Sequence, residues 1–430
     1  MAKKTINKEL TGAQDLYNFL FEACNIIRGP VSQDNFKDYI TPLLYYKRIS
    51  DVYDEETEEA LISSGGDKEY ASLPEQHRFV IPDGCHWQEV RERTENLGAA
   101  IVGAMRQIEI ANPDTLYGVL SMFSSQKWTN KAILNDSKIR DLIEHLSKRE
   151  LGNKDYPADL MGDAYEILLK KFADDSKAQA GEFYTPRSVV RLLVHILDPQ
   201  PGETIYDPAC GSGGMLIEAI RYMHDDFLCC GSIFGQEKNV VNAAIAKMNL
   251  FLHGASDFNV MQGDTLRDPK ILQGGNIAKF DCVIANPPFS LENWGATEWS
   301  SDKYKRNIYG TPSDSCGDYA WIQHMICSMV SGQGRMAVVM PQGILFRNQE
   351  TEIRKQLVES DLIEAVVTLG DKLFYGTGLS PCFLIIRRMK PAHHFGRILM
   401  IDGSKILTQK RAQNILEEND IDRLYSLYQN

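Results

Sequence analysis

Short apolar runs alternate with helix-like segments from residue 204 onward, and this alternation limits the possible folds of the chain more than any other feature. Strands that alternate with helices form parallel sheets covered on both faces, because each parallel pair needs a crossover connection. The last two runs lie close together, so they can pair antiparallel at the edge. We therefore expect an α/β fold with a mostly parallel sheet and one antiparallel edge strand. The runs lie at residues 204–206, 229–235, 258–261, 282–284, 336–340, 363–369 and 382–386.

The first 155 residues show helical periodicity without strand-helix alternation. A second helix, near residues 36–44, contains Thr41-Pro42, which we expect to bend or end it because proline lacks an amide donor. We expect an all-helical domain at 1–155, an α/β domain at 156–405 and a helical C-terminal segment at 406–430. In the first helix the apolar residues at helical spacing are Leu16, Leu20, Ala23 and Ile27.

Composition excludes several classes of protein. Apolar residues make up 43% of the chain, which is incompatible with a disordered protein. No apolar stretch approaches the length of a membrane helix, and the N-terminus has no apolar signal segment. The nine cysteines are scattered without a Cys-x-x-Cys pair. We therefore expect a reduced, cytoplasmic protein with no membrane contact and no metal site.

The charge of the chain bears on its partners. Lys and Arg number 46 against 58 Asp and Glu, a net charge of −12. Because nucleic-acid affinity depends on Lys and Arg at phosphates, we expect another chain to supply much of any grip on nucleic acid. The acidic run at 51–59 is typical of a solvated helix face. For the basic cluster Lys303, Lys305 and Arg306, a solvated loop is the commoner explanation and a phosphate contact the alternative.

A glycine-rich turn follows the run at 204–206 and precedes a helix that we expect from Met215 to about residue 224. It reads Asp207-Pro208-Ala209-Cys210-Gly211-Ser212-Gly213-Gly214. Glycines let the backbone approach a ligand, and the helix start offers free amide groups. The turn lacks the third glycine of a dinucleotide loop and the Gly-Lys-Ser/Thr of a P-loop. Asp207 is the first residue of the turn. Its carboxylate can pair with the ammonium group of an amino-acid-like ligand, or with a water beside that group, so it favours a ligand of this kind.

Two further carboxylates follow the next two expected strands. Glu237 comes after the second strand, where a carboxylate can accept hydrogen bonds from a ribose diol. Asp264 comes after the third, where it can accept from an adenine amino group. Either residue alone is more often a solvated loop residue. Together with Asp207, at three successive strand ends, they indicate an adenosine pocket along one edge of the sheet.

The tetrad Asn286-Pro287-Pro288-Phe289, called here the Asn286–Phe289 loop, follows the expected strand at 280–285. A rigid loop end is the alternative explanation for its two prolines. An amine conjugated to an aromatic ring is a poor nucleophile because its lone pair is delocalised. The Asn286 side-chain oxygen and the Pro287 carbonyl can accept hydrogen bonds from the two N–H groups of such an amine and so localise its lone pair. Phe289 can stack on an extruded base. The loop therefore predicts methyl transfer to an exocyclic amine.

These motifs resemble the N6-adenine DNA methyltransferases in their gamma arrangement, in which Gly181-Glu182-Phe183-Tyr184-Thr185-Pro186-Arg187 precedes the turn and the Asn286–Phe289 loop follows it. The resemblance implies a Rossmann-like S-adenosyl-L-methionine methyltransferase sheet. It makes Asn286, Pro287, Pro288 and Phe289 catalytic. The residues expected to bind S-adenosyl-L-methionine are Glu182, Phe183, Tyr184, Thr185, Pro186, Arg187, Asp207, Ala209, Gly211, Ser212, Gly213, Gly214, Glu237, Asp264 and Thr265.

Further motifs extend the resemblance along the chain: Gly317-Asp318-Tyr319, Pro341-Gln342-Gly343 and the segment from Leu373 to Gly378. With them the chain resembles the modification subunit of type I restriction-modification systems. This implies that double-stranded DNA is the substrate. It also implies a specificity subunit that reads the sequence and joins two methylation subunits, with a restriction subunit as a further partner. Phe374 or Tyr375 is the expected second aromatic near the flipped base, with a core role equally open.

One observation that fits the resemblance, one departure from it and two alternatives remain at this point. About fifty residues follow Gly378, too few for a target-recognition domain, so we expect another chain to read the DNA sequence. The family usually has a longer helical tail that binds the specificity subunit, so we expect a shortened chain or a short variant. The alternative functions are methyl transfer to ribosomal RNA or to a protein amide, and a scaffold that has lost catalysis.

Overall fold

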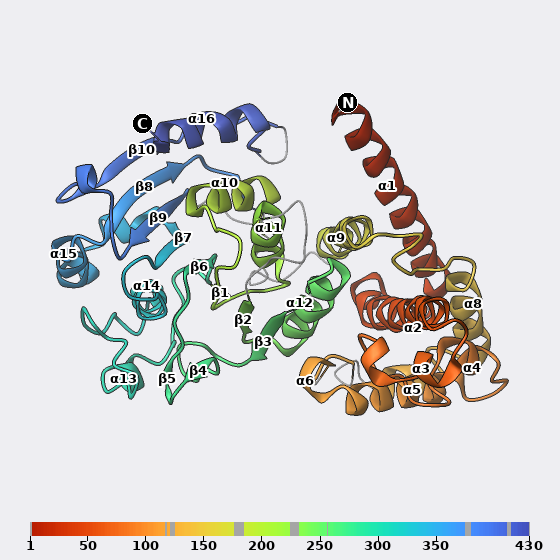
Figure 1. Ribbon diagram of the computed structural model, residues 1–430. Helices are drawn as coiled ribbons and strands as arrows, with labels where there is room; N and C mark the ends of the chain where they lie inside the picture. The colour runs from red at the N-terminus through yellow and green to blue at the C-terminus, as the bar shows by residue number, and fades with distance from the viewer. Residues whose placement is uncertain are drawn as a thin grey trace. The chain divides into compact units, whose positions relative to one another are not determined.

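The computed structural model describes residues 2–116, 118–120, 125–175, 185–223, 232–255, 257–374, 380–410 and 414–429. The chain divides into two compact units, one of residues 1–178 with 247–254 and one of residues 179–246 with 255–430 (Figure 1). No helix within the described ranges combines the length and apolar character that a membrane crossing requires.

The first unit is helical, as expected. On α1 the four apolar residues at helical spacing, from Leu16 to Ile27, have no exposed surface, so this face forms part of the unit's core. The helices are α1 (Ala2–Ile27), α2 (Lys37–Ser63), α3 (Lys68–Ala71), α4 (Trp87–Arg91), α5 (Leu97–Ala111), α6 (Pro113–Leu116), α7 (Ser125–Thr129), α8 (Asp136–Leu146) and α9 (Ala158–Asp175).

Two expectations for α2 hold only in part. Pro42 does not end the helix, which continues to Ser63, because a proline near the helix start removes only one backbone hydrogen bond. The acidic run is also not simply a solvated face, since Asp51 is buried beside Lys47 and accepts the Leu151 amide at 2.6 Å. These contacts bind α2 to a loop a hundred residues further along the chain.

The second unit contains the expected α/β sheet, with eight strands in the order β10-β8-β9-β7-β6-β1-β2-β3. Strand β9 is the antiparallel member, pairing with both β7 and β8. It therefore lies inside the sheet, and β10, parallel to β8, forms that edge instead. The strands are β1 (Ile205–Asp207), β2 (Ile233–Glu237), β3 (Phe258–Gln262), β6 (Cys282–Ala285), β7 (Arg335–Pro341), β8 (Ile363–Leu369), β9 (Pro381–Arg387) and β10 (Leu399–Gly403), with a separate hairpin of β4 (Leu272–Gln273) and β5 (Asn276–Ile277).

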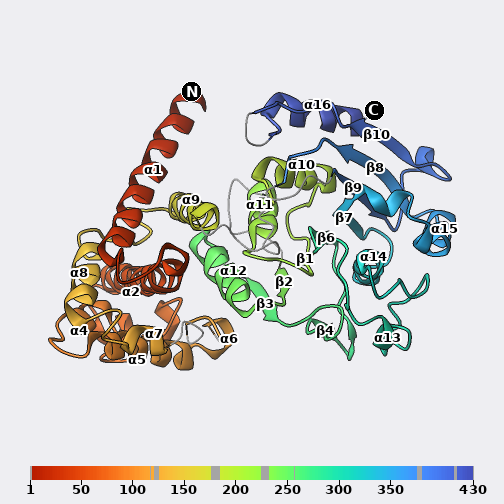
Figure 2. The same ribbon diagram turned by 180° about the vertical axis from the view of Figure 1, so that it is seen from behind.

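Helices cover both faces of this sheet (Figures 1 and 2). The apolar core on one face joins α14 to β6 and β7. Chain order reverses between β1 and β6, and at such a switch point the carboxyl ends of the strands open a crevice. The helices of this part of the chain are α10 (Arg187–Leu197), α11 (Gly214–Met223), α12 (Val240–Leu252), α13 (Ala296–Trp299), α14 (Asp318–Cys327), α15 (Thr351–Glu359) and α16 (Glu418–Gln429).

Candidate active site

The glycine-rich turn joins β1 to α11, as expected from the sequence. Gly211 and Gly213 have φ angles of +53° and +84°, a conformation that disfavours residues with a β-carbon. A β-carbon added at Gly211 or Gly214 would meet nothing within 4 Å. The turn therefore needs its glycines for backbone conformation and has open space beside two of them. Ser212, between the first two glycines, is partly buried.

Asp207 lies at the end of β1 with only 2% of its surface exposed. One carboxylate oxygen accepts the Ala209 amide at 2.9 Å. Burial raises the pKa of Asp207 to about 8, and the neighbouring Glu237 carboxylate adds to that rise. A buried carboxylate that is costly to ionise is prepared for a cationic ligand.

Glu237 ends β2 and lies against the turn. Its carboxylate accepts the Gly211 amide at 3.0 Å and the Asn239 amide at 2.7 Å, one on each oxygen. Each carboxylate oxygen has a second lone pair that can accept from a ligand hydroxyl. These two hydrogen bonds hold the carboxylate in place beside the glycine-rich turn.

Asp264 and Thr265 follow β3 and differ in role. Asp264 forms an ion pair with Lys238 at 2.9 Å and accepts the Arg267 amide at 3.2 Å. Thr265 is buried, and its hydroxyl donates to the Pro208 carbonyl at 2.6 Å. Thr265 thus supports the glycine-rich turn from below, and its predicted contact with a cofactor stays a prediction.

Of the element before the turn, the described part begins at Thr185, so the predicted residues Glu182, Phe183 and Tyr184 lie outside the described residues. Pro186 is the N-cap of α10. Arg187 begins this helix, and its guanidinium lies 3.7 Å from the Glu218 carboxylate.

The Asn286–Phe289 loop follows β6 at the same edge of the sheet as Asp207, since β6 and β1 are parallel neighbours. The Asn286 side-chain amide donates to the Thr185 hydroxyl at 2.8 Å. Its side-chain oxygen is buried and accepts no hydrogen bond from the part of the chain that the structure describes. An acceptor oriented by its own amide group and lacking a donor is suited to a ligand N–H.

The aromatic residues expected at the target base lie partly within the described residues. The rings of Phe289 and Phe374 are 6.4 Å apart between centroids and inclined by 58°. Phe374 is only 3% exposed, so it packs beside Phe289 and has little free face in this structure. Tyr375 lies outside the described residues.

The loop is also held by residues whose role the sequence did not reveal. The Ser290 amide donates to the Asp318 carboxylate at 2.7 Å, and Arg347 pairs with that carboxylate at 2.6 Å. Asp318 belongs to the motif Gly317-Asp318-Tyr319, so the sequence did mark this residue. Arg347 has no such signal, because its partner is 29 residues away in the chain.

The basic cluster after the loop divides into two kinds of residue. Lys303 and Lys305 are exposed, whereas Arg306 is only 2% exposed. Its guanidinium donates to both oxygens of Asp302 and to the carbonyls of Thr265 and Leu266. A phosphate contact by Arg306 is therefore excluded in this conformation.

We expect Arg306→Ala to lower the free energy of unfolding by about 3–5 kcal/mol, because it leaves the buried Asp302 carboxylate without its cation. Burial works to raise the pKa of Asp302, but hydrogen bonds from Arg306 outweigh it and hold the pKa below its ordinary value. Urea denaturation measures the change. Lys305→Ala is the matched control and should stay within about 0.5 kcal/mol. Equal stability of both variants would contradict this role.

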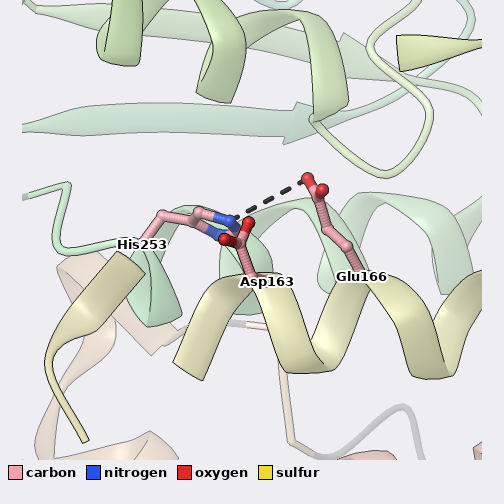
Figure 3. A group of neighbouring side chains, drawn as sticks. All are labelled: Asp163, Glu166 and His253. Atoms are coloured by element: carbon pink, nitrogen blue, oxygen red, sulfur yellow. Dashed lines mark ion pairs between the residues drawn. The ribbon is translucent and has the colours of Figure 1, made fainter. Parts of the chain in front are cut away.

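One group of side chains in the described ranges has spacing that could hold a metal ion: Asp163, Glu166 and His253, whose ligand atoms lie within 4.8 Å of one another (Figure 3). His253 Nδ1 lies 2.8 Å from the Asn249 carbonyl and therefore carries hydrogen, while Nε2 lies 3.9 Å from Glu166. A β-carbon at Gly162 would overlap this ring. This spacing does not by itself require a metal ion.

The sheet with its switch point, the glycine-rich turn and the Asn286–Phe289 loop together define an amino-methyltransferase. Comparison with known families gives the particular one. The family N-6 DNA Methylase matches residues 156–430, and the HsdM N-terminal domain matches residues 16–146. The chain belongs to the N-6 DNA Methylase family.

Individual relatives agree with this assignment. The type I restriction enzyme MjaVII methylase subunit of Methanocaldococcus jannaschii is 33% identical over 410 residues, which cover 90% of this chain and 68% of that protein. The HindI methylase subunit of Haemophilus influenzae is 33% identical over 300 residues, covering 69% of this chain and 62% of that protein. The crystal structure of the type I restriction-modification system methyltransferase subunit from Streptococcus thermophilus superimposes with a TM-score of 0.82 at 26% identity, covering 97% of this chain and 93% of that one.

The main prediction from the sequence is thereby confirmed. The chain is an N6-adenine DNA methyltransferase of the type I restriction-modification class. The alternatives, methyl transfer to RNA or to a protein amide and an inactive scaffold, gain no support from these relatives.

Proposed function

We propose that this chain transfers a methyl group from S-adenosyl-L-methionine to the N6 amine of an adenine flipped out of double-stranded DNA. The observation that carries the proposal is the buried side-chain oxygen of Asn286, at the carboxyl end of β6, with no donor among the described residues. A buried acceptor without a donor costs about 1–3 kcal/mol. An N–H bond of the target amine would remove that cost during the reaction.

The carboxyl edge of the sheet fits a cofactor that carries an ammonium group, a ribose and an adenine. Buried Asp207 suits the ammonium group, Glu237 the ribose diol and Asp264 the adenine amino group. Open space beside Gly211 and Gly214 lets a ligand approach the backbone. Three acidic side chains at one edge also favour a ligand with positive groups.

The residues of the loop act on the target amine. The Asn286 side-chain oxygen and the Pro287 carbonyl accept hydrogen bonds from the two N–H groups of the target amine. These hydrogen bonds draw the nitrogen towards tetrahedral geometry and localise its lone pair. Bound S-adenosyl-L-methionine supplies the electrophilic methyl group on a sulfonium. Phe289 stacks on the extruded base, and the Phe374 ring supports it from one side.

The proposed partners are double-stranded DNA, a specificity subunit shared by two methylation subunits, and a restriction subunit. Two observations support them: the relatives are methylase subunits of type I restriction enzymes, and the net charge of −12 is unfavourable for DNA binding by this chain alone. The cytoplasm is the proposed location. The domain boundaries at residues 155 and 405 stay predictions.

The test is transfer of a labelled methyl group to plasmid DNA, with and without the specificity subunit from the same genome. We expect N6-methyladenine as the product and a large increase in rate when the specificity subunit is present. Ribosomal RNA and total protein serve as alternative acceptors in the same assay. N4-methylcytosine as the product, or label in RNA or protein but not in DNA, would refute the proposal.

We expect a chelator to leave methyl transfer unchanged within about twofold, because hydrogen-bond acceptors and a sulfonium need no Lewis acid. The measurement compares initial rates before and after dialysis against EDTA. A different result would contradict this expectation: EDTA abolishes activity, Mn²⁺ or Zn²⁺ restores it, and neither ion restores it in His253→Ala. That result would establish a metal ion at the group drawn in Figure 3.

A further inference from the structure

The backbone directly after the Asn286–Phe289 loop is held in an uncommon conformation. Ser290 has a φ of +49°, in the left-handed region that residues with a β-carbon rarely occupy. Its amide donates to Asp318 at 2.7 Å, and the next residue's carbonyl accepts the Gly317 amide at 3.0 Å. Two hydrogen bonds thus attach the loop to the start of α14 and maintain this conformation.

Asp318 has no exposed surface, so its charge must be balanced inside the protein. Arg347 balances it, with Nη2 at 2.6 Å from one Asp318 oxygen while the other oxygen accepts the Ser290 amide. The same guanidinium pairs with Glu350, which is 2% exposed, at 2.9 and 3.2 Å. Burial disfavours its charge, but the hydrogen bonds to Asp318 and Glu350 hold the pKa of Arg347 above its ordinary value.

We propose that Arg347 is a positioning residue for methyl transfer: through Asp318 it fixes the Ser290 amide and so places the Asn286–Phe289 loop against the target amine. The inference rests on the proposed function and assigns a residue that lies outside the Asn286–Phe289 loop and the glycine-rich turn. A misplacement of about 1 Å at a reacting group can lower a rate about 100-fold, so an ion pair that holds the residue directly after the loop is enough to matter.

The test compares single and double variants in the DNA methylation assay, with the specificity subunit present. We expect Arg347→Ala to lower kcat about 100-fold while the KM for DNA and the cofactor Kd stay within about threefold. Asp318→Asn keeps an oxygen for the Ser290 amide and removes the buried charge. The double variant R347A/D318N should therefore be about tenfold more active than R347A.

Two controls separate this role from general destabilisation. Within the described residues Glu350 forms no hydrogen bond to the loop, so R347A/E350Q should regain stability but not kcat. Arg387→Ala removes an ion pair of similar exposure. The side chains of Arg387 and Glu364 are 24% and 4% exposed, and those of Arg347 and Asp318 are 25% and 0% exposed. It should lower the melting temperature and leave kcat unchanged. If R347A does not fold, Arg347→Lys, which retains a cation for Asp318, replaces it, with a smaller expected loss of kcat.

Three outcomes would overturn the inference. A raised KM for DNA with intact kcat would make Arg347 a phosphate contact. A double variant R347A/D318N no more active than R347A would show that Asp318 does not carry the effect, and wild-type kcat in R347A would show that there is no effect. Failure of the wild-type protein to methylate DNA would refute the proposed function instead, so the two failures are distinguishable.

Discussion

Replacing Asn286 by alanine is expected to lower kcat about 100- to 1000-fold, because the variant loses one of the two acceptors that localise the lone pair of the target amine. The cofactor Kd should stay within about threefold, since Asn286 lies on the target side of the site. The melting temperature should change little: the variant loses one hydrogen bond to Thr185 but also removes a buried oxygen without a donor. Single-turnover kinetics measure the rate, and calorimetry measures the cofactor Kd and the melting temperature.

Two matched variants test the reason given for this loss. Asn286→Asp keeps an acceptor oxygen and should lose less activity than Asn286→Ala. Thr185→Val keeps the shape of the side chain but removes the hydroxyl that holds the Asn286 amide, and should cost about tenfold in kcat. A kcat within tenfold of wild type in Asn286→Ala would contradict the assignment of the reaction centre.

Replacing Asp207 by asparagine is expected to weaken cofactor binding and to stabilise the folded protein at the same time. Removing the carboxylate leaves the ligand's ammonium group without its buried partner, which should raise the cofactor Kd about 100-fold or more. 5′-Methylthioadenosine lacks the amino-acid part and is the control ligand. It should bind the variant and the wild-type protein equally, and an equal loss for both ligands would contradict this assignment.

The stabilising effect depends on pH in a defined direction. The folded-state pKa of about 8 lies above the ordinary value of 3.8, so the folded protein holds this proton more tightly than the unfolded chain. The corresponding stability is lost as pH rises from 3.8 to about 8, because ionisation is then costly only in the folded state. The advantage of Asp207→Asn should therefore grow over this interval to a few kcal/mol and then level off. Denaturation of both proteins without cofactor at pH 6 and pH 8.5 measures it, and a less stable variant at pH 8.5 would contradict the shift.

The sequence determined the class of fold and indicated the position of the proposed reaction centre through local patterns. Turn glycines at Gly211 and Gly213 are visible in the sequence because few other residues adopt their φ angles. Carboxyl ends of parallel strands meet at one edge, so Asp207, Glu237 and Asp264 were expected together once their strands were recognised. These features need only the residues beside them and the direction of each strand.

Other features were missed because their cause lies far away in the chain. Strand β10 has a weak apolar pattern and becomes a strand through pairing with β8. The interior position of β9 between β7 and β8 depends on sheet order, which apolar runs do not encode. The role of the basic cluster Lys303, Lys305 and Arg306 stayed open in the sequence, because local sequence does not show whether an arginine is buried or exposed. Carbonyls of Thr265 and Leu266, about forty residues earlier, decide that Arg306 is buried.

The reaction centre shows the same division. Its four residues and their chemistry follow from the sequence, because the residue types themselves supply the acceptors and the stacking ring. The orientation of that chemistry depends on tertiary contacts: Thr185 turns the Asn286 amide from 101 residues away, and Asp318 with Arg347 holds Ser290. Buried hydrogen bonds and ion pairs form between residues that only folding brings together, so the tertiary structure alone decided which oxygen of the loop is left for the substrate.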